Sequence, residues 1–278
     1  MSLSYVKELY REAMIGAEPK TNEYFLLRSP LPTLTLVSAY VLFVKFIGPA
    51  YMKNRKPFKL NNAMLVYNIA TVFANLFLVI QGIKFFFFEG GSLRCETIKT
   101  AEQRDQEFPV VFMFYIIKLT EFMDTIFAVL RKKQSQVSNL HVLHHGSLPI
   151  SVWIGMKFVP GGHGIFFGWL NCCVHVVMYS YYALSAMGPS VQKYLWWKKY
   201  LTMLQLAHFV AIILHQSQVF FNGCEYPKWL SAWIMLNASM FWILFMDFYS
   251  HTYNKKVPKD EQYILSKLNN NNKEIKSQ

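Results

Sequence analysis

The chain has 278 residues, of which 53% are hydrophobic, 17% aromatic and only 16% charged. Soluble domains carry about 25% charged residues, so this composition argues against a soluble protein and favours an integral membrane protein. The net charge of +12 does not point to a nucleic-acid partner, because the lysines and arginines cluster in short loops between apolar segments.

Seven apolar segments follow one another, each near the roughly 20 residues that cross the hydrocarbon core of a bilayer. They cover residues 31–52, 63–86, 109–130, 138–157, 164–184, 200–221 and 230–253. We therefore predict an all-α, integral membrane domain of seven transmembrane helices over residues 31–253. Residues 1–30 form an N-terminal tail, and residues 254–278 form a polar, basic tail that is expected to be disordered.

The basic residues are divided unequally between the two sides of the predicted membrane domain. Sixteen of the 28 lysines and arginines fall in the loops after the first, third and fifth segments and in the C-terminal tail, whereas nine fall on the opposite side. Because positively charged loops stay in the cytosol, this predicts a cytosolic C-terminus and an N-terminus that is luminal or extracellular.

Two of the four cysteines, Cys95 and Cys224, lie in the loops after the second and sixth segments. The predicted orientation places both loops on the non-cytosolic side, where disulfides persist. We predict a Cys95–Cys224 disulfide; the alternative is two unrelated free thiols. Cys172 and Cys173 lie inside the fifth apolar segment.

Three histidines fall within five residues at the start of the fourth segment, at His141, His144 and His145. At about 100° per residue they cover roughly a third of a helix circumference, so their side chains are neighbours. We call these three residues the histidine box. Burying polar imidazoles in an apolar segment costs free energy, and ionisable residues inside membrane segments usually have a function. The histidine box is therefore a candidate site.

The third segment carries three ionisable residues on one helix face, Lys118, Glu121 and Asp124, of which the first two can pair. At 1.5 Å per residue, polar residues from six segments lie about 8–16 Å from the predicted cytosolic surface. They are Asn68, Asp124, His144, His175, Tyr179, Gln205 and Asp247. This common depth predicts a polar chamber near the cytosol with an apolar region beyond it.

Other histidines are expected to be structural, namely His163, His208, His215 and His251. Asp247 is four residues before His251 and can simply pair with it.

Three kinds of chemistry suit the histidine box and His175. Imidazole binds zinc or iron, but di-iron membrane enzymes need about eight histidines or more in several boxes, which leaves a lone zinc site open. A neutral imidazole is also a nucleophile for acyl transfer, with Asn171, Tyr179 and Gln205 as candidate oxyanion donors. Finally, Cys172 lies three residues before His175, and a thiol–imidazole pair is reactive.

Five blocks of residues, in this order and at this spacing, resemble the signature blocks of the very-long-chain fatty acid elongases. The blocks are Lys118-x-x-Glu121-x-x-Asp124-Thr125, Gln136-Val137-Ser138, His141-Val142-Leu143-His144-His145, Asn171-x-x-x-His175-x-x-Met178-Tyr179-x-Tyr181-Tyr182 and Lys198-Lys199-Tyr200-Leu201-Thr202-x-x-Gln205. Residues 187–200 are similar to the animal branch that favours saturated and monounsaturated chains.

The resemblance implies a multi-pass enzyme of the endoplasmic reticulum membrane, with six of its seven helices forming a barrel around a substrate tunnel. It implies condensation of a long-chain acyl-CoA with malonyl-CoA to a 3-oxoacyl-CoA that is two carbons longer, without a metal or other cofactor. The acyl group would be carried by His144, with His141, His145 and His175 assisting. Reductases and a dehydratase of the elongation cycle are implied partners, and the family allows a homodimer.

The resemblance also implies a supporting polar site, formed by Lys118, Glu121, Asp124, Gln136, Asn171, Tyr179, Thr202 and Gln205. Independently of it, basic residues ring the predicted cytosolic mouth and suit the phosphates of CoA. They are Arg131, Lys132, Lys198, Lys199, Lys255 and Lys256. Each of these lysines can equally serve only to orient the protein in the membrane.

Two residues depart from the family pattern, since many members carry Gln at the position of His208 and Asn at that of Asp247. Both departures concern details of CoA binding. Two other functions are weighed against condensation: a membrane di-iron or zinc-dependent lipid desaturase or hydroxylase, and a seven-span receptor or transporter without enzymatic activity.

Overall fold

The computed structural model describes residues 3–97 and 100–253, and all regular elements in these ranges are helices. The elements are α1 (Leu3–Ala13), η1 (Pro19–Glu23), α2 (Leu31–Leu42), η2 (Phe43–Ile47), α3 (Gly48–Met52), α4 (Asn61–Phe88), α5 (Ala101–Thr120), α6 (Phe122–Leu130), η3 (Gln134–Gln136), α7 (Asn139–Phe158), η4 (Gly162–Gly164), α8 (Ile165–Ala186), α9 (Pro189–Gln192), α10 (Lys198–Phe221) and α11 (Lys228–Tyr253). The prediction for the tail 254–278 lies outside the described residues.

Within the described ranges, five helical segments are long and apolar enough to cross a membrane, which confirms an all-α, multi-pass membrane protein. They cover residues 31–52, 61–88, 162–186, 198–221 and 228–253. The two other predicted spans, 109–130 and 138–157, are helical as well, in α5–α6 and in α7. Helix α7 carries the histidine box, and α5 carries Lys118 together with four charged residues in its first two turns, so polar residues lower the apolarity of both.

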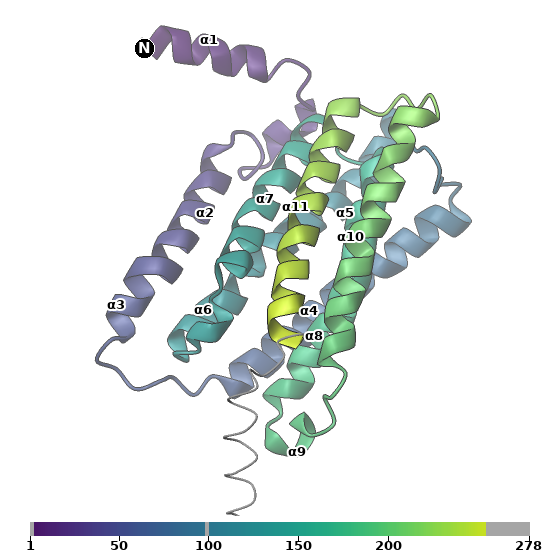
Figure 1. Ribbon diagram of the computed structural model, residues 1–278. Coiled ribbons are helices and arrows are strands. Elements are labelled where there is room, and N and C mark those ends of the chain that lie inside the picture. The colour runs from purple at the N-terminus through teal and green to yellow at the C-terminus, as the bar shows by residue number, and fades with distance from the viewer. Residues whose placement is uncertain (1–2, 98–99, 254–278) are drawn as a thin grey trace, which may run out of the picture.

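Six of the helices form a closed series of contacts (Figure 1). Helix α7 packs on α5, α5 on α4, α4 on α8, α8 on α10, α10 on α11, and α11 again on α7. Helix α2 packs against α7 from outside this ring, as both views show. The central space of the ring is therefore bounded by six helices.

The contact between α4 and α8 depends on a glycine. A Cβ atom at Gly82 would lie 2.1 Å from the Trp169 side chain, so a larger residue would push the two helices apart. The indole of Trp169 also donates a hydrogen bond to the backbone carbonyl of Val79, at 3.2 Å. A small residue and a large one thus fix the distance between these helices.

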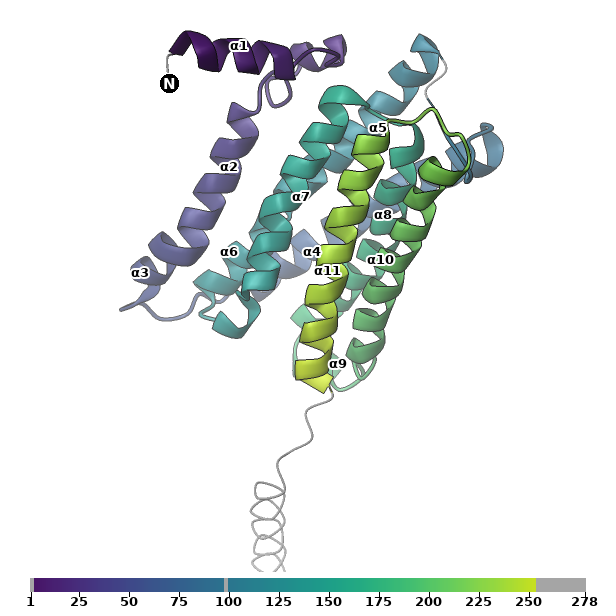
Figure 2. The ribbon, with the colours of Figure 1, turned by 45° about the horizontal axis from the view of Figure 1, so that its top comes forward.

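The connections lie at two opposite ends of the bundle (Figure 2). The loops after α3, α6 and α8 and the end of α11 share one end, which we call the basic end. The turn between α7 and α8 and the loops after α4 and α10 share the other, the disulfide end. This grouping matches the predicted topology, whereas the side of the membrane that each end faces stays a prediction.

The N-terminal segment packs on the disulfide end, which the sequence did not indicate. Leu27 is fully buried. The ammonium group of Lys157 donates to the hydroxyl of Thr21 at 2.7 Å, and the Trp153 indole donates to the Leu26 carbonyl at 3.2 Å. Residues before α2 therefore close part of the bundle against α7.

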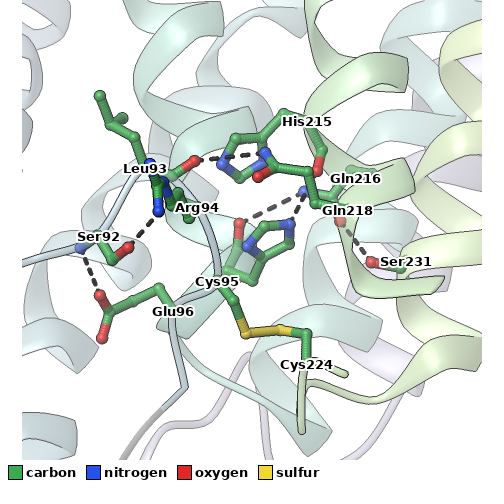
Figure 3. The surroundings of a disulfide bond; sticks show 11 residues. Ser92, Leu93, Arg94, Cys95, Glu96, His215, Gln216, Gln218, Cys224 and Ser231 are labelled. Carbon is green, nitrogen blue, oxygen red and sulfur yellow. Dashed lines mark hydrogen bonds between the residues drawn. A yellow bond between two sulfur atoms is a disulfide. The ribbon is translucent and has the colours of Figure 1, made fainter. Parts of the chain in front are cut away.

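The predicted disulfide between Cys95 and Cys224 is confirmed (Figure 3). It joins the loop after α4 to the loop after α10. Nearby, the Gln218 side chain donates to the Leu93 carbonyl at 3.3 Å, and the Ser231 hydroxyl donates to the Gln216 side chain at 2.7 Å. The other two cysteines, in α8, are free thiols.

The disulfide gives a first testable prediction. Its cysteines are separated by 129 residues, so the bond removes much conformational freedom from the unfolded chain. Replacing both, Cys95→Ser with Cys224→Ser, should lower the free energy of unfolding by about 2–5 kcal/mol. Thermal unfolding in detergent measures this, with the free thiol variant Cys173→Ser as control. Equal unfolding temperatures for the double variant and the control would contradict the prediction.

Candidate active site

Helix α7 brings the histidine box together, as predicted. The Ser138 hydroxyl caps the helix by accepting from the His141 backbone N–H at 3.2 Å, which starts the helix just before the box. The ring centroids of His141 and His145 are 4.3 Å apart, and those of His144 and His145 are 5.3 Å apart. The three imidazoles thus form one cluster.

A buried ion pair lies at the break between α5 and α6. The Lys118 Nζ and Glu121 Oε1 atoms are 2.5 Å apart, and both side chains are about 1% exposed or less. Lys118 also donates to Asn171 Oδ1, at 2.9 Å. Buried ions need such additional hydrogen bonds, because their Coulomb attraction alone does not offset the loss of hydration.

The same pair orients His175 on α8. Its Nδ1 atom lies 2.9 Å from Glu121 Oε1 and 3.2 Å from Lys118 Nζ. The carboxylate can only accept, so Glu121 bonds to this ring in the tautomer that carries the proton on Nδ1. In the same tautomer Nε2, which faces the amide nitrogen of Asn171 at 3.4 Å, is the basic nitrogen of His175.

The carboxylate of Glu121 also connects the two walls of the site. Its Oε2 atom lies 3.9 Å from His145 Nδ1 on α7, while its Oε1 atom contacts His175 on α8. One buried acid therefore faces imidazoles from two different helices.

Asp124 and Tyr179 continue this network towards the basic end. The Tyr179 hydroxyl donates to Asp124 Oδ2 at 2.5 Å. The Tyr179 ring is fully buried and lies 5.7 Å from the His175 ring and 6.1 Å from that of Tyr67. The prediction that polar residues of different helices meet thus holds for Asp124, Tyr179 and His175.

A cavity begins at this network and continues between the six helices of the ring. It comprises about 1110 Å³ of space between the atoms, counting its open parts. His144, Asn171 and His208 line it near the network, and Val159 and Tyr226 line it at the disulfide end. The residues between these ends are mostly apolar, for example Leu148, Val152, Met156, Phe167, Ile212 and Phe241.

Helix α11 contributes aromatic contacts to His144 that the sequence did not reveal. The ring of Phe241 lies 4.8 Å from the His144 ring at 80°, and that of Phe245 lies 6.3 Å away at 73°. The chain has 24 phenylalanines, and no motif distinguishes these two from the rest.

Several members of the predicted supporting site lie outside the hydrogen-bonded network just described. Gln136 is exposed in η3. Thr202 is buried, with its hydroxyl 3.5 Å from the Lys198 carbonyl. The Gln205 amide lies 3.3 Å from the sulfur of Met178.

The candidate CoA-binding residues that the structure describes lie at the basic end. Lys198 and Lys199 are exposed at the start of α10, and Arg131 at the end of α6 contacts the sulfur of Met64 at 3.0 Å. Lys255 and Lys256 lie outside the described residues.

The histidines that were expected to be structural differ among themselves. His163 and His215 stack with ring centroids 4.0 Å apart, and His251 pairs with Asp247 at 3.3 Å, as expected. His208 bonds to a backbone carbonyl one turn earlier, at 2.6 Å, but it also lines the cavity. In residues 3–97 and 100–253, no three His, Cys, Asp or Glu side chains are arranged to hold a metal ion.

Comparison with known proteins agrees with the resemblance seen in the sequence. The profile of the ELO (GNS1/SUR4) family matches residues 25–261. The chain is 46% identical over 258 residues to "Very long chain fatty acid elongase 7" of Drosophila melanogaster, covering 89% of this chain and 76% of the relative. It is 42% identical over 255 residues to "Very long chain fatty acid elongase 1" of Mus musculus, covering 90% and 91%.

The buried ion pair gives a second testable prediction. The change Lys118→Met leaves the Glu121 carboxylate buried without its cation and should lower the free energy of unfolding by about 3–5 kcal/mol. The control is Lys84→Met, since Lys84 forms an exposed pair with Glu89 at 3.8 Å and such pairs contribute little. Thermal unfolding in detergent compares the two variants. If both unfold like the parent protein, the ion pair does not stabilise the fold.

Proposed function

The chain belongs to the ELO (GNS1/SUR4) family and is an acyltransferase of the condensing step of fatty acid elongation, and from this premise we propose that His144 carries the acyl group. One observation carries the proposal. The structure describes all three residues of the histidine box, and His144 is the one among them that lines the cavity. An acyl chain in the apolar cavity would have its thioester beside this imidazole.

In the proposed first half-reaction, a ring nitrogen of His144 attacks the carbonyl carbon of the acyl-CoA thioester. The carbon–sulfur bond breaks, an acyl-imidazole forms, and the proton lost by the imidazole passes to the CoA thiolate. Asn171 of α8 also lines the cavity, and its side-chain amide is a donor that can stabilise a developing oxyanion.

In the proposed second half-reaction, malonyl-CoA loses CO₂ and leaves an enolate. The enolate carbon attacks the acyl carbon, the bond to His144 breaks, and a 3-oxoacyl-CoA two carbons longer forms. The released imidazole takes up one proton from solvent. His175 would assist this step, because Glu121 orients its ring and Nε2 is the basic nitrogen in the tautomer that donates to Glu121. His141 and His145 would orient His144 through their ring contacts.

We propose seven transmembrane helices, six of which form a barrel around the cavity, in the endoplasmic reticulum membrane. The closed series of helix contacts supports the barrel. The disulfide supports a luminal position for its end of the bundle, because disulfides persist there. The N-terminus would then be luminal and the C-terminus cytosolic, with acyl-CoA and malonyl-CoA entering from the cytosolic, basic end.

The proposed reaction transfers no electrons and uses no metal or other cofactor. Its product carries a ketone at the third carbon, which must be reduced and dehydrated before another round of elongation. Reductases and a dehydratase are therefore the expected partners in the cycle.

A thiol route is the second candidate mechanism, because Cys172 also lines the cavity and is 1% exposed. There, a thioester on Cys172 would replace the acyl-imidazole. The two routes predict different covalent adducts.

The adduct supplies the third testable prediction. Incubation with acyl-CoA in the absence of malonyl-CoA should leave an acyl group on His144, which mass spectrometry of proteolytic peptides can locate. The variant His144→Ala should lose the adduct and condensation, since one nucleophile is removed. Cys172→Ser should keep both. An adduct on Cys172, or normal condensation by His144→Ala, would contradict the proposal.

The basic end supplies a fourth prediction. Replacing Lys198 and Lys199 by alanine should raise the KM for both CoA substrates about two- to fivefold for each lysine, because exposed ion pairs contribute up to about 1 kcal/mol. The value of kcat should stay near that of the parent protein. The control is Lys228→Ala, at the opposite end of the bundle, and steady-state kinetics at two salt concentrations measure the effect. An unchanged KM for the double variant would show that these two lysines do not contribute to CoA binding.

A further inference from the structure

An acyl-imidazole can react with water as well as with a carbon nucleophile. Hydrolysis would break the bond between the acyl carbon and His144, transfer one proton from water to the ring, and release a free fatty acid. The net reaction is acyl-CoA plus water to fatty acid plus CoA, without use of malonyl-CoA. Efficient condensation therefore needs the acyl group on His144 to be shielded from water.

Two phenylalanines of α11 lie against the His144 ring, and a phenylalanine of α10 packs on them. Phe241 is 3% exposed, and its ring is nearly perpendicular to the His144 ring at a centroid distance of 4.8 Å. Phe245 lies one turn further along α11, with its ring 6.3 Å from His144. Phe209 of α10 contacts both, at 6.4 Å and 5.4 Å. We call these three phenylalanines the aromatic cover.

The aromatic cover belongs to an apolar cluster that continues along the cavity. Phe209, Phe241, Ile212 and Ala238 are buried together, and all four line the cavity. On its other side, the His144 ring faces His145 at 80° and 5.3 Å. The imidazole thus lies between an imidazole of the polar network and a phenyl ring of the apolar cavity.

We propose that Phe241 is a positioning residue that holds the His144 ring and excludes water from its acyl adduct. This inference rests on the proposed function, since it needs the adduct on His144. The perpendicular contact restricts rotation of the imidazole, because such a geometry is favourable only over a narrow range of ring orientations. The phenyl ring also fills the space beside the imidazole that water would otherwise enter.

The experiment measures two products from one labelled acyl-CoA: free fatty acid and 3-oxoacyl-CoA, with and without malonyl-CoA. The variant Phe241→Ala should raise the ratio of hydrolysis to condensation about tenfold, which is about 1.4 kcal/mol in relative barriers. Phe241→Leu keeps an apolar side chain of moderate size, so its ratio should lie between those of Phe241→Ala and the parent protein. If Phe241→Ala does not fold, the ratios measured for Phe241→Leu and Phe241→Met test the inference instead.

The matched control is Phe86→Leu on α4. Phe86 is 8% exposed and packs on Trp169 with ring centroids 5.3 Å apart, so this variant loses similar packing outside the candidate site. Its ratio of hydrolysis to condensation should equal that of the parent protein.

The outcomes separate the inference from the proposed function. If the folded Phe241 variants keep the parent ratio of hydrolysis to condensation, whatever their overall rate, Phe241 only packs and the inference is overturned. If the parent protein shows no acyl adduct on His144, the proposed function fails on its own evidence, whatever the ratio. An adduct on His144 together with a raised ratio supports both.

Discussion

The ion pair between Lys118 and Glu121 is the interaction on which the candidate site depends. Both charges are buried, so each needs the other and further polar partners to offset lost hydration. Those partners, Asn171, His175 and His145, come from α8 and α7. Because the buried charges need these partners, the ion pair helps to fix the positions of α7 and α8. The orientation of His175 follows from this balance rather than from its own helix.

This polar network gives the cavity two chemically different ends. At one end, imidazoles, an amide and a buried carboxylate can transfer protons and stabilise charge; beyond them, the lining is mostly apolar. A thioester with a long hydrocarbon chain has the same division between a polar reacting group and an apolar tail.

The sequence predicted the features that depend on local spacing or on charge distribution. The histidine box follows from helical periodicity, the Lys118–Glu121 pair from a spacing of three residues, and the disulfide from the topology that the basic loops indicate. Rotation of each helix about its axis is not encoded locally, however. The sequence could not show that His144 faces the cavity while Gln136 is exposed, or that Phe241 covers the imidazole, because these depend on packing between distant segments.

The position of α8 is fixed at more than one level. Near its middle, Asn171 and His175 bond to the ion pair of Lys118 and Glu121. About one turn from its start, which lies at the disulfide end, the close contact of Trp169 with Gly82 of α4 adds a steric limit. Helix α8 also packs on α10. A helix held in this way has little freedom to slide or rotate, and hydrogen bonds near 3 Å tolerate little displacement. The packing of Trp169 on Gly82 therefore helps to keep His175 at its distance from Glu121.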